Sequence, residues 1–286
     1  GDELFEYEFR VENGLGNGLR RRPGIRAGGK EAPNMRRVHK SDFGGPDSHS
    51  CATCHSKGGP DGAGTNTQNA YLRGNGRNAN TADERNAPHV LGLGAVQALA
   101  IEMSVELQAQ RTAALEAAGV LGEPQEVPLE SKGVSFGVLK VSPDGVVDTS
   151  GIKGVDPDLV VKPFGWKGHQ ATIRGMAEES FRIHMGILSM REQAAVRDGN
   201  IPPINHGDGT WYDLDRDGTT LEVDSCMLTT MVSYLSQLEV PVVRPPRDEY
   251  LLDLFGRGEL LFEEIGCAQC HRSTLILHDP VLKVRP

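Results

Sequence analysis

The chain contains 286 residues, of which 38% are hydrophobic and 24% are charged, and its formal net charge at pH 7 is -9. The composition is that of an ordinary globular protein, and the length corresponds to roughly two domains. The acidic balance argues against nucleic acid as a partner, because phosphate binding needs a basic face. No apolar run approaches the roughly 20 residues that a membrane-spanning helix requires, so we expect no membrane span.

A short acidic and hydrophobic segment occurs near both ends of the chain. The first copy, Gly1-Asp2-Glu3-Leu4-Phe5-Glu6, is similar to the second copy at residues 258–263, which reads Gly-Glu-Leu-Leu-Phe-Glu. The second copy leads into a Cys-x-x-Cys-His motif after a few residues, whereas a long loop rich in Gly, Arg and Pro separates the first copy from its own motif. The repeat predicts two related units that each begin with a helix, with a loop inserted into the first.

Two Cys-x-x-Cys-His pentapeptides use four of the five cysteines in the chain. In this motif the two thiols are spaced to add to the two vinyl groups of a haem, and the next imidazole reaches the iron as proximal ligand. Zinc sites, thioredoxin-like redox pairs and disulfides also use paired cysteines, but a histidine directly after both second cysteines favours haem. The sequence therefore predicts two covalently bound c-type haems. Their attachment residues are Cys51, Cys54, His55, Cys267, Cys270 and His271.

The predicted haems indicate a location and a kind of partner. Thioether attachment takes place outside the cytoplasmic membrane, so we expect a periplasmic or otherwise exported protein. The chain opens at Gly1 without a basic and apolar leader, as expected of a mature chain whose signal peptide is missing from this sequence. An electron donor with a basic patch would complement the acidic charge. The basic loop from Arg20 to Lys40 is either solvated surface or a source of arginines for the haem propionates.

Between the two motifs, helix and strand signals alternate. Residues 58–80 are rich in Gly and Asn and predict a loop, whereas residues 90–118 have apolar side chains at helical spacing and predict a long amphipathic helix. Residues 134–141 alternate as a strand does, and a Pro-Asp-Gly turn leads to a return strand at 146–147. A further helix is predicted at 171–185. We therefore expect a small β insertion in a helical body.

An acidic loop precedes the next helix. The segment from Asp213 to Asp224 fits the spacing of a calcium-binding loop, with acidic groups at positions 1, 3, 5 and 12 and a glycine at position 6. The acidic groups are Asp213, Asp215, Asp217 and Asp224. We favour calcium over an unmetallated acidic turn, because carboxylates at alternate positions repel one another unless a cation joins them. A helix is expected at residues 225–238, with Cys226 as a buried small apolar residue.

Two further segments complete a family resemblance. They are Arg85-Asn86-Ala87-Pro88, after the first motif, and Phe164-Gly165-Trp166-Lys167 in the middle of the chain. With the paired haem motifs, the repeated helices and the calcium-type loop, they make the chain resemble bacterial di-haem cytochrome c peroxidases and MauG-type enzymes over essentially its whole length. It looks most similar to the di-haem oxidoreductase branch of that superfamily.

The resemblance implies a fold class and a set of domains. The fold would be mainly α, with two cytochrome c-like haem domains, a small β insertion and an acidic calcium-type loop. We expect a first haem domain at residues 1–126, a β-decorated middle segment at 127–240 and a second haem domain at 241–286. Only a short tail follows His271, so the second domain looks incomplete at its C-terminus.

The resemblance also implies a function. It predicts an oxidoreductase that reduces or uses hydrogen peroxide, or another small oxidant, at one haem with an open coordination position. Electrons would be relayed through the other haem and supplied by a redox partner such as a small cytochrome or a copper protein. The alternative is a non-catalytic di-haem cytochrome that only transfers electrons. Tight protein ligands on both faces of both irons would favour this alternative.

By the same resemblance, Glu102 on the long helix is the candidate that moves a proton between the peroxide oxygens, although a surface glutamate fits the pattern equally. His89 is the competing distal group. Trp166 is the candidate electron relay between the haems, with Trp211 as the alternative, and either indole would also suit a packed interior.

The sixth ligand of the second haem is the remaining assignment. The predicted helix at 171–185 offers His184 and Met185 near its end, and His169 lies just before it. We prefer His184 as this ligand.

Overall fold

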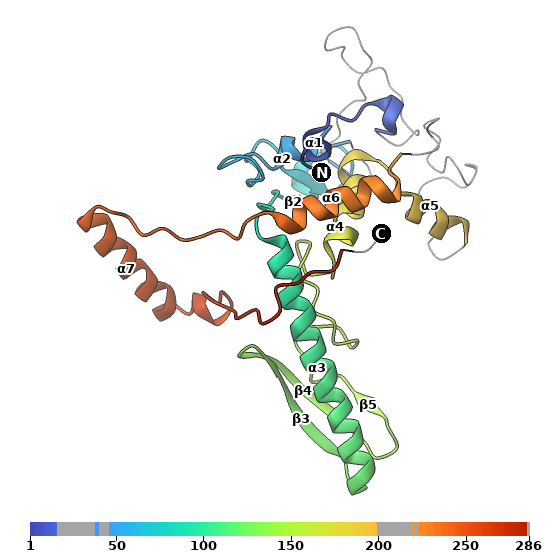
Figure 1. Ribbon diagram of the computed structural model, residues 1–286, viewed down its shortest axis with the longest axis vertical. Helices are drawn as coiled ribbons and strands as arrows, with labels where there is room; N and C mark the ends of the chain where they lie inside the picture. The colour runs from blue at the N-terminus through green and yellow to red at the C-terminus, as the bar shows by residue number, and fades with distance from the viewer. Residues whose placement is uncertain (16–37, 40–45, 199–218, 220–221, 285–286) are drawn as a thin grey trace. The chain divides into compact units, whose positions relative to one another are not determined.

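The computed structural model describes residues 1–15, 38–39, 46–198, 219 and 222–284 (Figure 1). The chain divides into two compact units. Unit 1 comprises Gly1–Gly94, Pro163–Leu238 and Leu282–Pro286, and unit 2 comprises Ala95–Lys162 and Glu239–Val281. This division differs from the three consecutive segments expected from the sequence, because the chain leaves unit 1 along a long helix and returns to it at Pro163.

The expectation of a mainly α protein built from two cytochrome c-like domains is wrong. The structure has 41% helix and 13% strand in two small sheets, which makes it a mixed α/β fold. One sheet pairs β1 (Ala70–Leu72) with β2 (Asp83–Arg85) in antiparallel register. These strands lie in and beside the segment expected to be a loop. They are three residues each, too short for an alternating pattern to be read from the sequence.

Unit 1 contains short helices around one apolar core. Its helices are α1 (Asp2–Glu6), the 3-10 turn η1 (Val11–Asn13), α2 (Cys51–Cys54), the 3-10 turn η3 (Ala79–Thr81), α4 (Ile173–Ser180), the π-helix η4 (Phe181–Met185), α5 (Met190–Arg197) and α6 (Ser225–Gln237). Phe5, Ile173, Phe181 and Met231 are buried together in the core. The helix expected at 171–185 thus forms as α4 followed by a π-helix.

Helix α1 approaches α6 closely in unit 1 (Figure 1). A Cβ atom on Gly1 would lie 2.4 Å from the Cβ of Tyr234 and 2.6 Å from the carbonyl oxygen of Thr230. Real Cβ atoms do not approach other atoms so closely, and a glycine allows the two backbones to meet. The glycine at the start of the first repeat therefore allows α1 to pack closely against α6.

Unit 2 joins most of a long helix to a three-stranded antiparallel sheet. Helix α3 (Leu93–Leu121) begins in unit 1 and is followed by β3 (Gln125–Ser131), β4 (Val134–Val141) and β5 (Val147–Asp148), in the sheet order β3-β4-β5. Buried residues of the helix, such as Leu107 and Ala118, pack with Leu129 and Leu139 of the sheet. The expected long helix and β insertion are thus confirmed, with the helix shifted towards the C-terminus.

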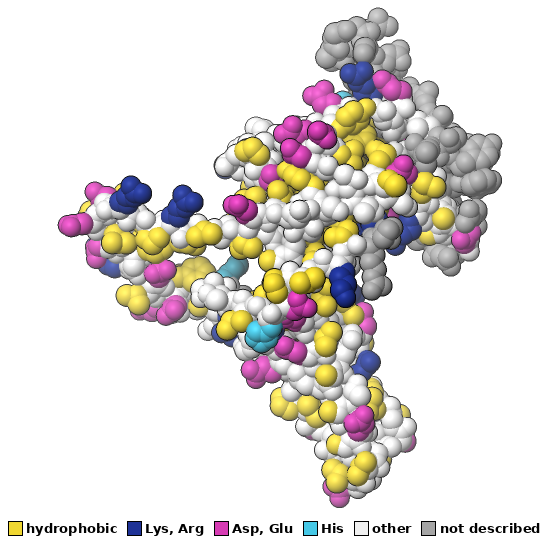
Figure 2. All heavy atoms as spheres, in the orientation of Figure 1, with side chains coloured by type: hydrophobic (Ala, Val, Ile, Leu, Met, Phe, Trp, Pro, Cys, Tyr) yellow, Lys and Arg dark blue, Asp and Glu magenta, His cyan; other side chains and the backbone are white. Residues whose placement is uncertain are grey.

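The remainder of unit 2 is α7 (Glu249–Glu264) and the 3-10 turn η5 (Cys267–Gln269). Among the described residues, α7 buries none of its own side chains. Most of its large apolar side chains are 41–68% exposed and are visible in yellow along this helix in Figure 2. These are Tyr250, Leu251, Leu252, Leu254, Leu260, Leu261 and Phe262. Ile265, which follows the helix, is also exposed. In the described part of the chain, no helix combines the length and the apolar character needed to span a bilayer.

Candidate haem-attachment sites

The first Cys-x-x-Cys-His motif forms a single helical turn. Ser50 caps this turn, because its hydroxyl accepts a hydrogen bond from the backbone N–H of Thr53 at 3.3 Å. The backbone N–H of His55 donates to the carbonyl of Cys51 at 3.1 Å and closes the turn. Residues three apart on a helical turn lie on the same side, so Cys51 and Cys54 are presented together.

The imidazole of His55 is held by a backbone carbonyl. Its Nδ1 lies 2.7 Å from the carbonyl oxygen of Pro88. A carbonyl only accepts hydrogen bonds, so Nδ1 carries the proton in this contact. The backbone of Gly62 also forms a hydrogen bond that acts on the pKa of His55. Burial is the main cause that lowers the pKa of His55, and it favours the neutral form that a metal requires. The Arg85–Pro88 segment thus orients the proximal ligand candidate.

A pocket of about 350 Å³ opens beside this imidazole. The Phe5 and His55 ring centroids are 5.9 Å apart, and Phe5 also lies 5.6 Å from the ring of Tyr234. The Tyr234 hydroxyl donates to Asp61 Oδ1 at 2.7 Å. The lining is made by Phe5, Glu6, Ala52, His55, Ser56, Gly59, Pro60, Asp61 and Tyr234. The pocket therefore combines aromatic walls with a histidine at one side, which are the features that a flat apolar cofactor needs.

The sulfur chemistry of this motif fits thioether attachment. Loss of water contact raises the pKa of the Cys51 thiol to about 12, and the neighbouring Cys54 adds to this effect. The Cys51 sulfur is consequently in an environment that disfavours a thiolate and accepts a neutral group. A thioether is neutral. The residues of the first motif therefore fit a covalently attached haem.

The second motif repeats this local geometry. Gly266 adopts a left-handed conformation (φ 87°) after α7 and turns the chain into η5, which contains Cys267. The backbone N–H of His271 donates to the carbonyl of Cys267 at 2.9 Å. The Phe262 and His271 ring centroids are 6.0 Å apart. Phe262 stands in its repeat where Phe5 stands in the first, so the sequence repeat is also a repeat in space.

Three residues of unit 2 hold the segment that follows the second motif. Arg272 donates from Nη2 to the carbonyl of Gly133 at 3.1 Å. Glu102 accepts from the backbone N–H groups of His278 at 2.9 Å and Asp279 at 2.6 Å, and it pairs with Lys132 Nζ at 2.7 Å. The tail of the second motif is therefore anchored on α3 and the β3–β4 turn.

These contacts define the chemistry of Glu102. The hydrogen bond from Lys132 is the largest cause that lowers its pKa to about 2, and the Asp279 amide adds to it. A carboxylate with so low a pKa is a weak proton acceptor at neutral pH. The arrangement suits an anchor better than the proton-transfer group suggested by the family resemblance.

His184 lies in unit 1, the unit that contains the first motif. The sequence had suggested it as a ligand of the second haem. His184 belongs to the π-helix, and its Nδ1 lies 2.8 Å from Asp47 Oδ2. Of the other ligand candidates, Met185 is buried and His169 is paired with Glu179 at 2.6 Å. His184 and His169 are thus each paired with a carboxylate, whereas Met185 is buried in the core of unit 1.

Trp166 lies on the surface of unit 1 and is 59% exposed. The guanidinium carbon of Arg85 lies 5.4 Å from the centre of the indole ring, which is within the range of a cation–π interaction. This contact joins the Phe164–Lys167 segment to the Arg85–Pro88 segment, whose last residue holds His55. The two segments that carried the family resemblance are thus neighbours.

The calcium-type loop falls largely outside the described residues. Asp213, Asp215 and Asp217 lie there, as do Trp211 and the basic loop apart from its Val38–His39 end. Asp224 is described, and its Oδ1 accepts from the backbone N–H of Met227 at 2.7 Å as the N-cap of α6. Where the chain is described, no three or more His, Cys, Asp or Glu side chains are grouped to hold a metal ion. Cys226 is exposed, so its expected burial is wrong.

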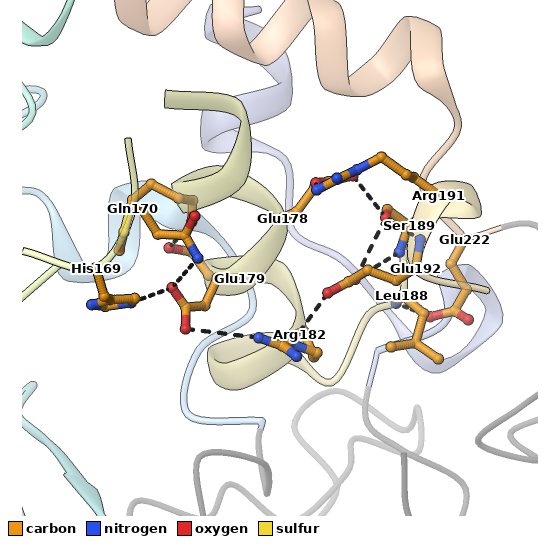
Figure 3. A network of polar contacts seen from close by, with 12 residues as sticks. His169, Gln170, Glu178, Glu179, Arg182, Leu188, Ser189, Arg191, Glu192 and Glu222 are labelled. Atoms are coloured by element: carbon orange, nitrogen blue, oxygen red, sulfur yellow. Dashed lines mark hydrogen bonds and ion pairs between the residues drawn. The ribbon is translucent and has the colours of Figure 1, made fainter. Parts of the chain in front are cut away.

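A buried polar network next to the π-helix was not foreseen from the sequence (Figure 3). Glu178 is 1% exposed, and it accepts from Arg191 Nε at 2.9 Å and from the Ser189 hydroxyl at 2.9 Å. Arg182, in the π-helix, lies 3.2 Å from Glu192, and burial raises the pKa of that glutamic acid. These charges brace the chain on both sides of His184. Nothing in their local sequence distinguishes them from surface charges.

Comparison with protein-family models, with curated proteins and with solved structures found no match. The resemblance to the di-haem peroxidases therefore rests on the motifs themselves. Within unit 1, contacts connect three of those motifs: Cys51–His55, Arg85–Pro88 and Phe164–Lys167.

Proposed function

We propose that this protein is a di-haem c-type oxidoreductase that reduces or uses hydrogen peroxide. The observation that carries the proposal is the first motif. Two cysteines stand on one helical turn, and the histidine after them has Nδ1 held by the Pro88 carbonyl at 2.7 Å beside a pocket of about 350 Å³. The second motif forms a 3-10 turn, and the ring of Phe262 lies beside His271 as that of Phe5 lies beside His55.

The residues of each motif have separate tasks in this proposal. Cys51 and Cys54, and likewise Cys267 and Cys270, hold one haem each through thioethers, and His55 and His271 are the proximal ligands. The Pro88 carbonyl fixes the tautomer of His55 and makes its Nε2 a stronger donor. A bound haem supplies one-electron redox chemistry at iron. Two haems match the two electrons that reduction of a peroxide consumes.

Trp166 is the proposed electron relay. Its support is the cation–π contact with Arg85, which places the indole against the segment that ends at the His55 partner Pro88. Its exposed indole is also accessible to a donor protein. A small cytochrome or copper protein with a basic face would suit the net charge of -9.

Calcium and an exported location remain parts of the proposal. The spacing of Asp213, Asp215, Asp217 and Asp224 supports calcium, and thioether attachment of haem supports the periplasm or another exported location.

A second candidate function is electron transfer without catalysis. The observation that favours it is the hydrogen bond between His184 and Asp47, a residue that lies shortly before the first motif in the sequence. A histidine oriented in this way is a ready second axial ligand, and two irons with both faces ligated would leave peroxide no access.

Mass spectrometry of the denatured chain and rapid mixing with peroxide test the proposal together. We expect a mass increased by two haems and a change of the Soret band when hydrogen peroxide meets the oxidised or half-reduced protein. Two haems without any reaction would favour the electron-transfer cytochrome. A chain without covalent haem, and with zinc in its place, would overturn both candidates.

A further inference from the structure

Two backbone segments contact the imidazole of His55, and one residue connects them. The Pro88 carbonyl accepts from Nδ1 at 2.7 Å, and the backbone of Gly62 forms the other hydrogen bond that acts on the His55 pKa, which burial lowers. Asp61 directly precedes Gly62. Its carbonyl oxygen accepts from the backbone N–H of Val90, two residues after Pro88, at 3.0 Å. Asp61 therefore joins the two segments on which the position of the imidazole depends.

The loop that contains Asp61, residues 57–63, is closed on itself. The backbone N–H of Lys57 donates to the carbonyl of Ala63 at 2.7 Å, and the N–H of Ala63 donates to the carbonyl of Lys57 at 3.0 Å. A Cβ atom on Gly62 would overlap the Lys57 carbonyl oxygen, so this close approach requires a glycine. The loop thus has one tight backbone path, and Asp61 stands at a defined place on it.

Asp61 has an unusual backbone conformation. Its φ is 59°, in the left-handed region that residues with a side chain rarely adopt and that aspartate and asparagine tolerate better than most. The residue is 9% exposed, so its carboxylate needs a hydrogen-bond partner within the protein. Conformations of this kind persist where surrounding contacts determine them, and they are concentrated at functional sites.

Tyr234 supplies the partner from helix α6. Its hydroxyl donates to Asp61 Oδ1 at 2.7 Å, across 173 positions of the sequence. Burial, and next the hydrogen bond to Asp61, raise the pKa of Tyr234, so the hydroxyl keeps its proton and remains a donor at neutral pH. The ring centroid of Tyr234 lies 5.6 Å from that of Phe5, which lies 5.9 Å from that of His55. Tyr234, Asp61 and His55 line the same pocket.

These contacts give Tyr234 an influence on His55 without direct contact. A carbonyl that accepts from the ring N–H of a metal-binding histidine fixes the orientation of the ring and raises its basicity. For His55 this carbonyl belongs to Pro88, whose segment is tied to Asp61 through Val90. A phenol that fixes Asp61 consequently also fixes the acceptor of the imidazole N–H.

We propose that Tyr234 and Asp61 are positioning residues for His55: the phenol holds the loop of residues 57–63, and the loop holds the Pro88 carbonyl against the imidazole. The inference rests on the proposed function, since it requires a haem at Cys51 and Cys54. A bound haem supplies an iron whose reduction potential depends on the hydrogen bonds of its axial ligand. Loss of the Tyr234 hydroxyl should weaken the bond to Pro88, make His55 a weaker donor and raise this potential.

Redox titration of the purified di-haem protein tests the inference. Tyr234→Phe keeps the ring that packs beside Phe5 and removes only the hydroxyl. We expect both haems to remain attached, one reduction potential to shift to a higher value and the other to stay at the wild-type value. A residue that only stabilised the fold would lower the urea midpoint and leave both potentials unchanged, so urea denaturation of the same variant separates the two roles.

The Asp61 variants test the other half of the pair. Asp61→Asn tolerates the left-handed conformation and keeps an oxygen that can accept from Tyr234, so the potential should stay close to that of the wild type. Asp61→Ala removes the acceptor and should reproduce the shift of Tyr234→Phe. Tyr71→Phe is the matched control, because the Tyr71 hydroxyl also donates to a carboxylate of unit 1, that of Glu84 at 3.3 Å, away from the lining of the pocket. It should leave both potentials unchanged.

The outcomes separate the inference from the proposed function. Absence of covalent haem in the wild type would overturn both. Two attached haems with unchanged potentials in Tyr234→Phe, or an equal shift in Tyr71→Phe, would overturn the positioning role and leave the oxidoreductase proposal standing. A shift in Tyr234→Phe and Asp61→Ala, with Asp61→Asn close to the wild type, would support the positioning role even if the protein did not react with peroxide.

Discussion

The two Cys-x-x-Cys-His motifs share a local geometry but have different surroundings. In both, the histidine N–H closes a turn onto the first cysteine, and a phenylalanine ring lies about 6 Å from the imidazole. Phe5 of the first motif is 3% exposed and packs in the core of unit 1, whereas Phe262 is 41% exposed on a helix that buries none of its own side chains among the described residues. Both motifs thus close a turn from the histidine N–H to the first cysteine, α-helical in the first and 3-10 in the second, and the surrounding elements decide how well each turn is supported.

The difference extends to the histidines. His55 is held by a carbonyl of a segment distant in sequence and lines a pocket. The pair of His184 and Asp47 lies in the same unit. The segment after His271 is held by Glu102 and Lys132, contacts that anchor the chain rather than orient the imidazole. At the first site the contacts hold the imidazole itself, whereas at the second site they hold the segment that follows the motif.

Among the changes that test this comparison, loss of one thioether should produce the largest difference in haem retention between the two sites. Cys267→Ala should release the second haem more completely than Cys51→Ala releases the first, because the first haem would keep Cys54, the oriented His55 and the pocket. Denaturing mass spectrometry and haem staining before denaturation measure retention. Cys226→Ala is the control, since this exposed cysteine lies outside both motifs, and it should keep both haems. Equal loss from both sites would contradict the asymmetry.

Removal of the matched phenylalanines should give the second largest difference between the two sites. Phe5→Ala deletes a buried ring and should cost about 3–5 kcal/mol of unfolding free energy, whereas Phe262→Ala should cost no more than about 1 kcal/mol because its ring is already half exposed. Urea denaturation of the haem-loaded proteins gives both values. Similar costs for the two variants would show that Phe262 is as well packed as Phe5.

The polar network beside His184 should contribute a smaller amount. Glu178→Gln removes the charge that Arg191 and Ser189 share, and it should destabilise unit 1 by about 1–3 kcal/mol because the carboxylate is buried. Asp253→Asn on α7 breaks an exposed pair with Arg257 and should cost less than about 0.5 kcal/mol. Thermal unfolding of the two variants measures how much each ion pair contributes to stability. A neutral Glu178→Gln would show that the network does not brace the π-helix.

Glu102→Gln should have the smallest effect on chemistry. If Glu102 is an anchor, the rate of reaction with hydrogen peroxide should stay near that of the wild type, while residues 278–279 should exchange their amide hydrogens faster. A rate reduced by on the order of 10²–10⁴ in stopped-flow mixing would instead restore Glu102 as the proton-transfer group.

The same residue predicts a pH dependence. A carboxyl whose pKa falls on folding stabilises the folded state above its unfolded-state pKa, and this stabilisation disappears as the pH falls through the folded-state pKa. For Glu102 this window runs from the ordinary value of 4.5 down to about 2. The protection of the C-terminal amides, taken relative to their intrinsic exchange rates at each pH, should therefore decrease across this acid range in the wild type and change less in the glutamine variant.

The sequence alone determined the features that depend on residues close together in the chain. A Cys-x-x-Cys-His motif spans one helical turn, so the side on which its thiols stand follows from local geometry, and both motifs adopt such a turn. The apolar period of α3 and the alternation of β4 likewise predict elements that the structure contains. These signals are strong because each is repeated over several residues of one element.

Only the tertiary structure decided the features that join distant residues. Asp47 and His184 are 137 positions apart, and the carbonyl that orients His55 is 33 positions away, so no local pattern relates them. The mixed α/β class and the division into two interleaved units are decided in the same way, because packing of whole elements against one another selects them. The turns of the two candidate haem-attachment motifs thus depend on short segments, whereas the partner of each imidazole depends on how the entire chain folds around it.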